Sequence, residues 1–207
     1  MSMGNRYTLE NEIRRHHELG EINRTAEIAI RAYGDEIRGW LVGVTRDRTT
    51  AIEIYSATCE DIWRGLPGFR WDSSFRTWAY QVARNAWSRH LRSMERAREV
   101  EVQFDDDALC KLPQWDRSET HPWQRTEMRD SLARLRALLT PAERTLLSLR
   151  VEQRMAWDDI ARIVASDGEP PSPEAIRRKA TALRQQFQRL KAKLHAFAAQ
   201  EGLLQLA

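Results

Sequence analysis

The chain has 207 residues, of which 42% are hydrophobic, and a formal net charge of +3 at pH 7, so it can bury one moderate core or two small ones. Its two cysteines, Cys59 and Cys110, lack any Cys-x-x-Cys or Cys/His spacing, which excludes the usual zinc motifs, and no cofactor is expected. No apolar run approaches the ~20 residues that cross a bilayer, and no basic start precedes an apolar segment. We therefore expect a soluble, cytoplasmic protein.

The charge is unevenly distributed along the chain. From Arg76 to Arg98 there are six arginines and one acid, and from Glu174 to Lys193 there are seven cations and one acid. The stretch between them, from Glu99 to Glu119, holds seven acids and two cations. Two basic blocks therefore flank an acidic connector, which the net charge of the whole chain hides.

Almost every periodic segment has the spacing of a helix, and the alternation typical of strands is essentially absent. We therefore predict an all-α fold with two small helical domains. The expected order is an N-terminal arm (1–24), a helical domain (25–98), an acidic linker (99–123), a second helical domain (124–200) and a C-terminal tail (201–207).

Two amphipathic helices are predicted first, over residues 25–44 and 49–66, and Pro67-Gly68 ends the second. Their core-facing side chains are expected to be Ile28, Ala32, Ile37, Trp40 and Leu41 in the first helix and Ile52, Tyr55, Cys59, Ile62, Trp63 and Leu66 in the second. The second helix also has a charged side, whose simplest interpretation is a solvated surface. Its residues are Glu53, Glu60, Asp61 and Arg64.

A helix with three different sides is predicted over residues 74–92, and Asp72 or Ser73 is expected to cap its first free amides. The side expected to be buried contains Phe75, Trp78, Ala79, Val82 and Ala86. The arginine-containing side contains Thr77, Gln81, Arg84, Ser88 and Arg92. The aromatic side contains Tyr80, Trp87 and Leu91. Guanidinium groups neutralise phosphates and aromatic faces accept unstacked bases at ~1–3 kcal/mol per base, so this mixture suits a nucleic acid. The alternative is that the rings pack against a neighbouring helix while the arginines are solvated.

The Asp105-Asp106-Asp107 run could indicate a metal site or a general acid. Three adjacent residues cannot all face one point, and no downstream carboxylate or histidine supports such a site. A solvated linker is the better interpretation.

The last third of the sequence predicts a helix-turn-helix. After a helix near 123–139, Thr140-Pro141-Ala142-Glu143 forms a capping box that starts a new helix with Leu146, Leu147, Leu149 and Val151. A short helix follows over 156–165, then a turn over 166–171, and Ser172 caps a long helix that begins at Pro173. In that fold the long helix lies in the major groove. The expected readers of guanine or phosphate are Arg177 and Arg178, and those of base edges are Thr181 and Gln185. A helical hairpin with a solvated basic face is the alternative.

The first helical domain is suited to separated DNA strands and the second to duplex DNA. A protein that binds both is suited to a process in which duplex DNA is opened, such as transcription initiation. The chain here resembles conserved region 2 of the extracytoplasmic-function (ECF) branch of sigma-70 family factors, in Trp63-Arg64-Gly65-Leu66-Pro67-Gly68-Phe69, Ser74-Phe75-Arg76-Thr77-Trp78-Ala79-Tyr80 and Ala83-Arg84-Asn85. It is similar to region 4 of that family in Leu139 to Arg144, Trp157 to Ala161 and Ala175 to Arg178.

The resemblance implies a factor, not an enzyme, that binds core RNA polymerase, recognises the −10 and −35 promoter elements and promotes melting. It implies that the helix from Ile52 to Leu66 docks on the β′ clamp helices through Glu53, Glu60, Asp61 and Arg64, while the β flap is a second contact. The residues it implies at the −10 element are Trp71, Asp72, Ser74, Phe75, Trp78, Arg84, Asn85 and Arg89. Those it implies at the −35 element are Ser172, Glu174, Arg177, Arg178, Thr181 and Gln185.

The docking helix departs from the family pattern. Where the family often has Asp-Leu-x-Gln-Glu-x-Phe, this chain has Glu53-Ile54-Tyr55-Ser56-Ala57-Thr58-Cys59. An anti-sigma factor is left open as a further partner, and no membrane contact is expected. The rival functions are a stand-alone helix-turn-helix regulator that binds duplex DNA as a dimer, and a metal-dependent nucleic-acid enzyme that uses the aspartate run.

Overall fold

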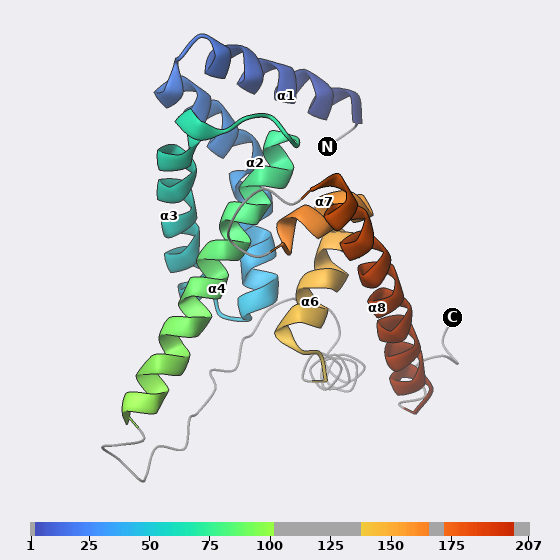
Figure 1. Cartoon of the computed structure of the whole chain (residues 1–207). Coiled ribbons are helices and arrows are strands. Elements are labelled where there is room, and N and C mark those ends of the chain that lie inside the picture. The colour runs from blue at the N-terminus through green and yellow to red at the C-terminus, as the bar shows by residue number, and fades with distance from the viewer. Residues whose placement is uncertain (1–2, 102–137, 166–171, 201–207) are drawn as a thin grey trace, which may run out of the picture. The chain divides into compact units, whose positions relative to one another are not determined.

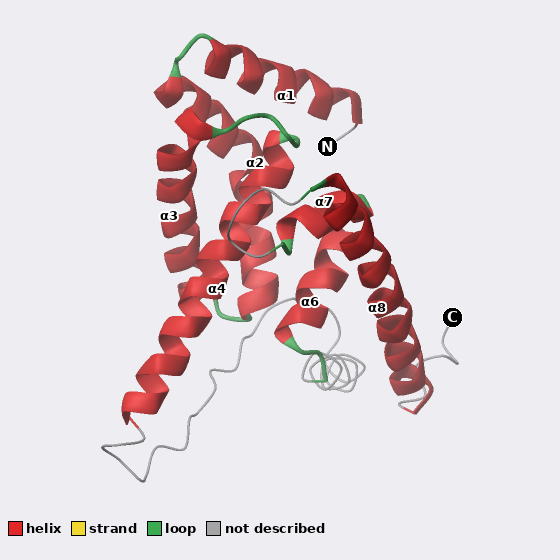
Figure 2. Cartoon of the chain, viewed as in Figure 1, coloured by secondary structure: helices red, strands yellow, loops and turns green. Residues whose placement is uncertain are grey.

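The computed structural model describes residues 3–101, 138–165 and 172–200, and within these ranges every regular element is a helix (Figures 1 and 2). The predicted all-α fold is therefore confirmed. None of the helices in the described part of the chain is long and apolar enough to cross a membrane. The predicted aspartate run, Cys110, residues 123–137 of the helix predicted near 123–139 and the turn over 166–171 lie outside the described residues, while residues 138 and 139 form a turn and not a helix end.

The chain divides into two compact units. The N-terminal unit comprises residues 1–111 with 162–169, and the C-terminal unit comprises residues 112–161 with 170–207. The N-terminal unit contains α1 (Met3–Glu18), α2 (Ile22–Thr45), α3 (Arg48–Gly65), a short 3₁₀ turn η1 (Leu66–Gly68) and α4 (Phe75–Glu101) (Figure 1). The segment expected to be an N-terminal arm is thus mostly the helix α1, which packs against α2 and the start of α4.

The core of the N-terminal unit lies between α2, α3 and α4. Tyr33 and Trp40 on α2 and Phe75 and Tyr80 on α4 are almost completely buried. Tyr33 stacks on Phe75 with the ring centroids 6.2 Å apart, and Trp40 meets Tyr80 edge-on at 5.4 Å. Aromatic side chains bury a large apolar area each, so these two pairs account for much of the packing between α2 and α4.

Helix α3 packs closely on α2 through a glycine. A Cβ built on Gly34 would lie 2.3 Å from the hydroxyl oxygen of Tyr55. The side chain of Tyr55 therefore occupies the space that any larger residue at position 34 would need. Burial raises the pKa of the Tyr55 hydroxyl to about 12, which agrees with a ring held against the neighbouring helix.

The predicted core-facing side of α3 is partly wrong. Ile52 is 48% exposed and Trp63 is 52% exposed, whereas the buried side chains are Ala51, Ile54, Thr58 and Ile62. The prediction followed the large apolar residues Ile52 and Trp63, but the buried face of α3 is rotated away from them and includes the small Ala51 and the polar Thr58. Thr58 can be buried because its hydroxyl donates to the carbonyl of Ile54 at 2.7 Å, so its polar group is satisfied inside the helix.

The predicted aromatic side of α4 is also wrong. Tyr80 is fully buried and Trp87 is buried, so neither ring is available to stack on a base. Tyr80 packs on Trp40 of α2, which is the alternative that the sequence had left open.

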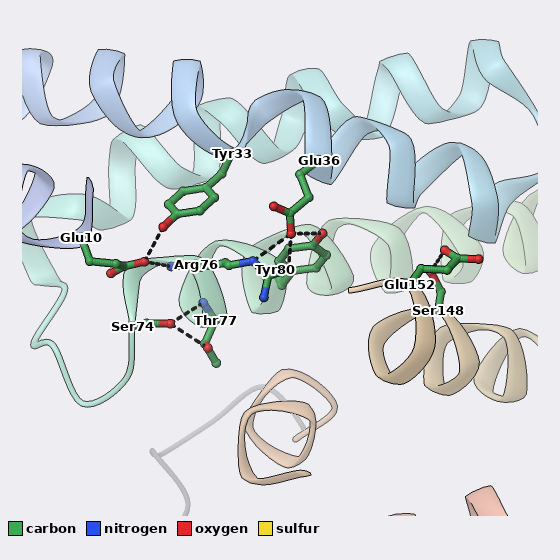
Figure 3. A network of polar contacts seen from close by, with 9 residues as sticks. All are labelled: Glu10, Tyr33, Glu36, Ser74, Arg76, Thr77, Tyr80, Ser148 and Glu152. Carbon is green, nitrogen blue, oxygen red and sulfur yellow. Dashed lines mark hydrogen bonds and ion pairs between the residues drawn. The ribbon is translucent and has the colours of Figure 1, made fainter. Parts of the chain in front are cut away.

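The C-terminal unit contains α6 (Pro141–Leu147), a π-helical turn η2 (Ser148–Glu152), and α8 (Pro173–Gln200), and α7 (Trp157–Ile163) begins within it. The predicted capping box is confirmed: Thr140 accepts from the Glu143 amide at 3.2 Å, and Glu143 accepts from the Thr140 amide at 2.8 Å. Val151, predicted as an apolar anchor, is instead 54% exposed. The π-helical turn, in which Ser148 donates to Glu152 (Figure 3), changes the register that regular α-helical spacing would have given.

Candidate nucleic-acid interface

A cluster of aromatic side chains lies where the loop between η1 and α4 meets the first turns of α4. Phe69 is buried at its centre and lies 4.7 Å from Trp78, 4.8 Å from Trp71 and 5.9 Å from Phe75 between ring centroids. Trp71 and Trp78 are half-buried, so part of each indole reaches the surface. A Cβ on Gly65 would lie 3.1 Å from the Trp78 ring, so the end of α3 is shaped to admit that indole.

The start of α4 is capped from two directions, and neither of the predicted caps, Asp72 and Ser73, provides them. The Thr77 amide donates to Ser74 Oγ at 3.1 Å. The amides of Phe75 and Arg76 donate to the two carboxylate oxygens of Glu10 on α1, at 2.7 and 3.0 Å. Figure 3 shows Glu10 beside Arg76. A carboxylate at this helix end satisfies orphan donors and is favoured by the helix dipole.

Glu10 also ties α4 to α2. The Tyr33 hydroxyl donates to Glu10 Oε1 at 2.8 Å. Burial, and then this hydrogen bond, raise the pKa of the Tyr33 hydroxyl above its usual range, so Tyr33 stays a donor. One carboxylate on α1 therefore joins three helices, a role that sequence reasoning missed because the partners are distant in the chain.

A largely buried ion pair removes one arginine from the predicted basic surface. Arg76 is 9% exposed, and its guanidinium donates to Glu36 on α2 (Figure 3). The Tyr80 hydroxyl donates to the same carboxylate oxygen at 3.0 Å, and the guanidinium lies 5.4 Å from the Tyr80 ring centroid. Burial, and then the charge of Glu36, raise the pKa of the Tyr80 hydroxyl above its usual range. Arg76, Glu36 and Tyr80 thus form part of the structural core.

The side chains predicted at the −10 element fall into three environments. Phe75 is only 1% exposed and supports the aromatic cluster from inside. Asp72 and Ser74 are exposed, and Asp72 lies 3.7 Å from the Arg70 guanidinium. The remaining five side chains reach the surface wholly or in part, and they are Trp71, Trp78, Arg84, Asn85 and Arg89.

The side chains predicted to bind polymerase lie along α3. Glu53, Glu60 and Arg64 are exposed, and Arg64 pairs with Glu60 at 2.5 Å. Asp61 pairs with Arg89 on α4, so two residues predicted for different partners contact each other. The exposed Ile52 and Trp63 add apolar area to this helix, which sequence reasoning missed because it assigned both to the core.

The side chains predicted at the −35 element lie on α8 and its cap. Ser172 Oγ accepts from the Ala175 amide at 3.2 Å, as predicted. Opposite the buried side chains of this helix, all six residues predicted to read DNA are exposed: Ser172, Glu174, Arg177, Arg178, Thr181 and Gln185.

Helix α8 is held against α6 and α7 by contacts near its middle and its end. Trp157 meets Phe187 at 5.5 Å between ring centroids, and Lys193 Nζ lies 3.0 Å from the Glu143 carboxylate. The same ammonium group donates to the carbonyl of Leu138 at 2.7 Å. These contacts leave the outer face of the first turns of α8 exposed.

Comparison with known proteins shows which proteins this chain resembles. Residues 29–97, which cover most of α2, α3 and most of α4, match the model of sigma-70 region 2. The chain is 26% identical over 149 residues to the RNA polymerase sigma-H factor of Pseudomonas aeruginosa, covering 68% of this chain and 75% of that protein. It is 28% identical over 138 residues to the RNA polymerase sigma factor YlaC of Bacillus subtilis, covering 65% and 76%.

The chain is thus similar to RNA polymerase sigma factors of the sigma-70 family over residues 29–97 and over about two thirds of its length, which agrees with the resemblance seen in the sequence. A stand-alone helix-turn-helix regulator is not favoured. The rival enzyme depends on Asp105 to Asp107, which lie outside the described residues.

Proposed function

We propose that this chain binds core RNA polymerase, directs it to promoters and helps open the −10 element, with no catalytic activity of its own. The observation that carries this proposal is the aromatic cluster around Phe69, which presents two half-buried indoles, Trp71 and Trp78, on a family domain whose role is transcription initiation. Cytoplasmic localisation follows from this role.

Base extrusion suits this cluster. Unstacking a base costs a few kcal/mol, which a pocket of rings and polar groups can offset. Trp78, Gln81 and Asn85 recur at helical spacing on α4, so an indole, two amides and the neighbouring Arg84 lie along one strip of the helix. We assign base contact to Trp71 and Trp78, polar contact to Asn85 and phosphate contact to Arg84 and Arg89. Phe75 supports the rings from the core, and the exposed Asp72 and Ser74 border the same loop.

We assign core polymerase binding to the exposed side of α3, with the β′ clamp helices as its partner. Glu53, Glu60 and Arg64 supply charge, while Ile52 and Trp63 supply apolar area that is costly to leave in water. A surface that combines a central apolar area with a charged surround is typical of protein interfaces. Asp61 contributes by holding Arg89 through the ion pair between α3 and α4.

Helix α8 is assigned to duplex reading at the −35 element, and its unit to the β flap contact. The exposed Arg177 and Arg178 on its second turn are suited to guanine edges or phosphates, and Thr181 and Gln185 continue the same surface. Thr181 Oγ1 donates to the Arg177 carbonyl at 3.0 Å, which fixes its hydroxyl along the helix.

The decisive experiment reconstitutes purified chain with core polymerase on genomic DNA and sequences the 5′ ends of the transcripts. A sigma factor gives start sites with shared −10 and −35 elements, and permanganate footprints show unpaired thymines near the start. A stand-alone regulator would give no promoter-dependent transcripts without another sigma factor. Trp78→Ala is expected to reduce opening while polymerase binding is kept; equal loss of both would indicate misfolding and contradict the assignment.

A further inference from the structure

Helix α1 contacts the loop that bears Trp71 as well as the start of α4. The His17 ring lies 2.8 Å from the carbonyl of Leu66 through Nε2, and the Trp71 indole N–H donates to His17 Nδ1 at 3.1 Å. The Arg14 guanidinium lies 5.5 Å from the Trp71 ring centroid. One imidazole therefore touches the loop near its beginning and at its central indole.

The partners of His17 define its chemical form. A carbonyl oxygen can only accept, so Nε2 must carry a hydrogen, and an indole nitrogen can only donate, so Nδ1 must have a free lone pair. Both hydrogen bonds therefore require the neutral ring with its hydrogen on Nε2. Protonation of Nδ1 would place a second N–H against the indole N–H and remove the contact with Trp71.

The backbone at Trp71 needs such a restraint. Its φ is 61°, in the left-handed region that bulky residues seldom adopt. Conformations of this kind persist only where surrounding contacts hold them. The Trp71 side chain contacts His17 and Arg14 on α1 and the Phe69 ring, so α1 supplies part of the restraint.

We infer that α1 is part of the promoter-opening site, and that His17 is a positioning residue that holds the Trp71 loop in its DNA-ready shape before DNA arrives. The inference rests on the proposed function, because it assigns a role to α1 in that same site. A preformed loop avoids the cost of ordering it during opening. The match to sigma-70 region 2 begins at residue 29, so α1 lies outside it.

The test compares His17→Ala with His16→Ala in the full-length holoenzyme at a promoter found by 5′-end sequencing. His16 is the neighbouring imidazole on α1, but its Nδ1 pairs with Glu21 at 2.5 Å instead of contacting the loop. For His17→Ala we expect about a tenfold fall in open complex by permanganate footprinting, the size expected for losing two hydrogen bonds. Affinity for core polymerase should stay near wild type, the free energy of unfolding should fall by no more than the loss of two hydrogen bonds explains, and His16→Ala should open DNA normally.

A pH series separates positioning from simple packing. Opening by wild type, measured relative to His17→Gln at each pH, should fall as the pH is lowered, because a proton on Nδ1 removes the acceptor of the Trp71 indole N–H, whereas an amide keeps its acceptor. Gln can still donate and accept, so it should restore more opening than Ala. The charged groups around the contact are Arg14 with Glu18 on α1 and Arg70 with Asp72 on the loop. His16→Ala must keep the wild-type profile, which excludes the second imidazole as the source.

A spectroscopic reading completes the test. The Trp71 indole N–H resonance, assigned by its loss in Trp71→Phe, should shift with pH in wild type and stay constant in His17→Gln. If wild type opens promoters and His17→Ala opens them equally well, the inference is overturned while the proposed function stands. If wild type opens no promoter, the proposed function is overturned, and this inference with it.

Discussion

The start of α4 and the starts of α6 and α8 differ in the sequence distance over which their helix caps act. In the C-terminal unit, Thr140 and Glu143 cap a helix three residues apart, and Ser172 caps α8 in the same local way. At the start of α4 the cap includes Glu10, which is 65 residues away from Phe75. A local cap can be predicted from residues that are neighbours in the sequence, whereas a long-range cap forms only when the fold brings distant residues together.

The buried Glu36–Arg76 pair should show the largest effect of any long-range contact. Arg76→Ala leaves the Glu36 carboxylate, whose side chain is 22% exposed, without its cation. Breaking a buried pair costs about 3–5 kcal/mol, so we expect a loss of this order in the free energy of unfolding, measured by urea denaturation. The double variant Glu36→Gln, Arg76→Met should recover part of it. Equal losses for the single and double variants would show that the charge is not what matters.

Close packing of α2 on α3 should give the next largest effect. Gly34→Ala improves the intrinsic helix propensity of α2, yet its Cβ would collide with the Tyr55 hydroxyl. Overpacking typically costs about 1–3 kcal/mol, so the steric term should exceed the gain in propensity. Urea denaturation measures the loss, and Gly34→Ala combined with Tyr55→Phe should recover part of it. A stabilised single variant would contradict the packing described here.

The long-range cap at Glu10 can be compared directly with an exposed acid on the same helix. Glu10→Ala leaves the amides of Phe75 and Arg76 without their acceptor, and loss of a cap costs about 0.5–2 kcal/mol. Glu12→Ala, exposed on α1, should change stability by less than about 0.5 kcal/mol. Hydrogen exchange at the first turn of α4 should increase in Glu10→Ala alone. Unchanged exchange there would mean that α1 does not cap α4.

Sequence reasoning found what periodicity and local chemistry determine. The start of α6, the Ser172 cap and the exposed face of α8 follow from a few neighbouring residues, and the structure has them as predicted. The failures at Tyr80 and Arg76 share one physical cause, because the partners of both side chains are distant in the sequence. Tyr80 was assigned to the surface and Arg76 to the basic block because nothing in α4 reveals that Glu36 on α2 receives both.

On α3 the limit was a weak hydrophobic signal, and at the candidate site it was again distant partners. The true core stripe of α3 includes Ala51 and Thr58, which have weak hydrophobic signals, so the more apolar Ile52 and Trp63 misled the assignment. The −10 residues could be chosen by resemblance to a family, but their support by Glu10 and His17 could not. The role of His17 depends on which atoms contact its two ring nitrogens, and only the three-dimensional structure shows these contacts.

The smallest expected effect tests whether the local cap is also electrostatic. The Thr140 amide, and then Lys193, lower the pKa of Glu143 below its ordinary value. A carboxyl with a lowered folded-state pKa stabilises the fold above its unfolded pKa of about 4.3, and that stabilisation disappears as the pH falls through the lowered pKa. The Glu143→Gln variant keeps an acceptor for the Thr140 amide but does not titrate. Between about pH 6 and pH 3 the wild type should therefore lose a few tenths of a kcal/mol more than the variant, read from hydrogen exchange along α6 at each pH. Parallel losses would show that the capping box works through hydrogen-bond geometry alone, and that the charge on Glu143 adds nothing to the local contact.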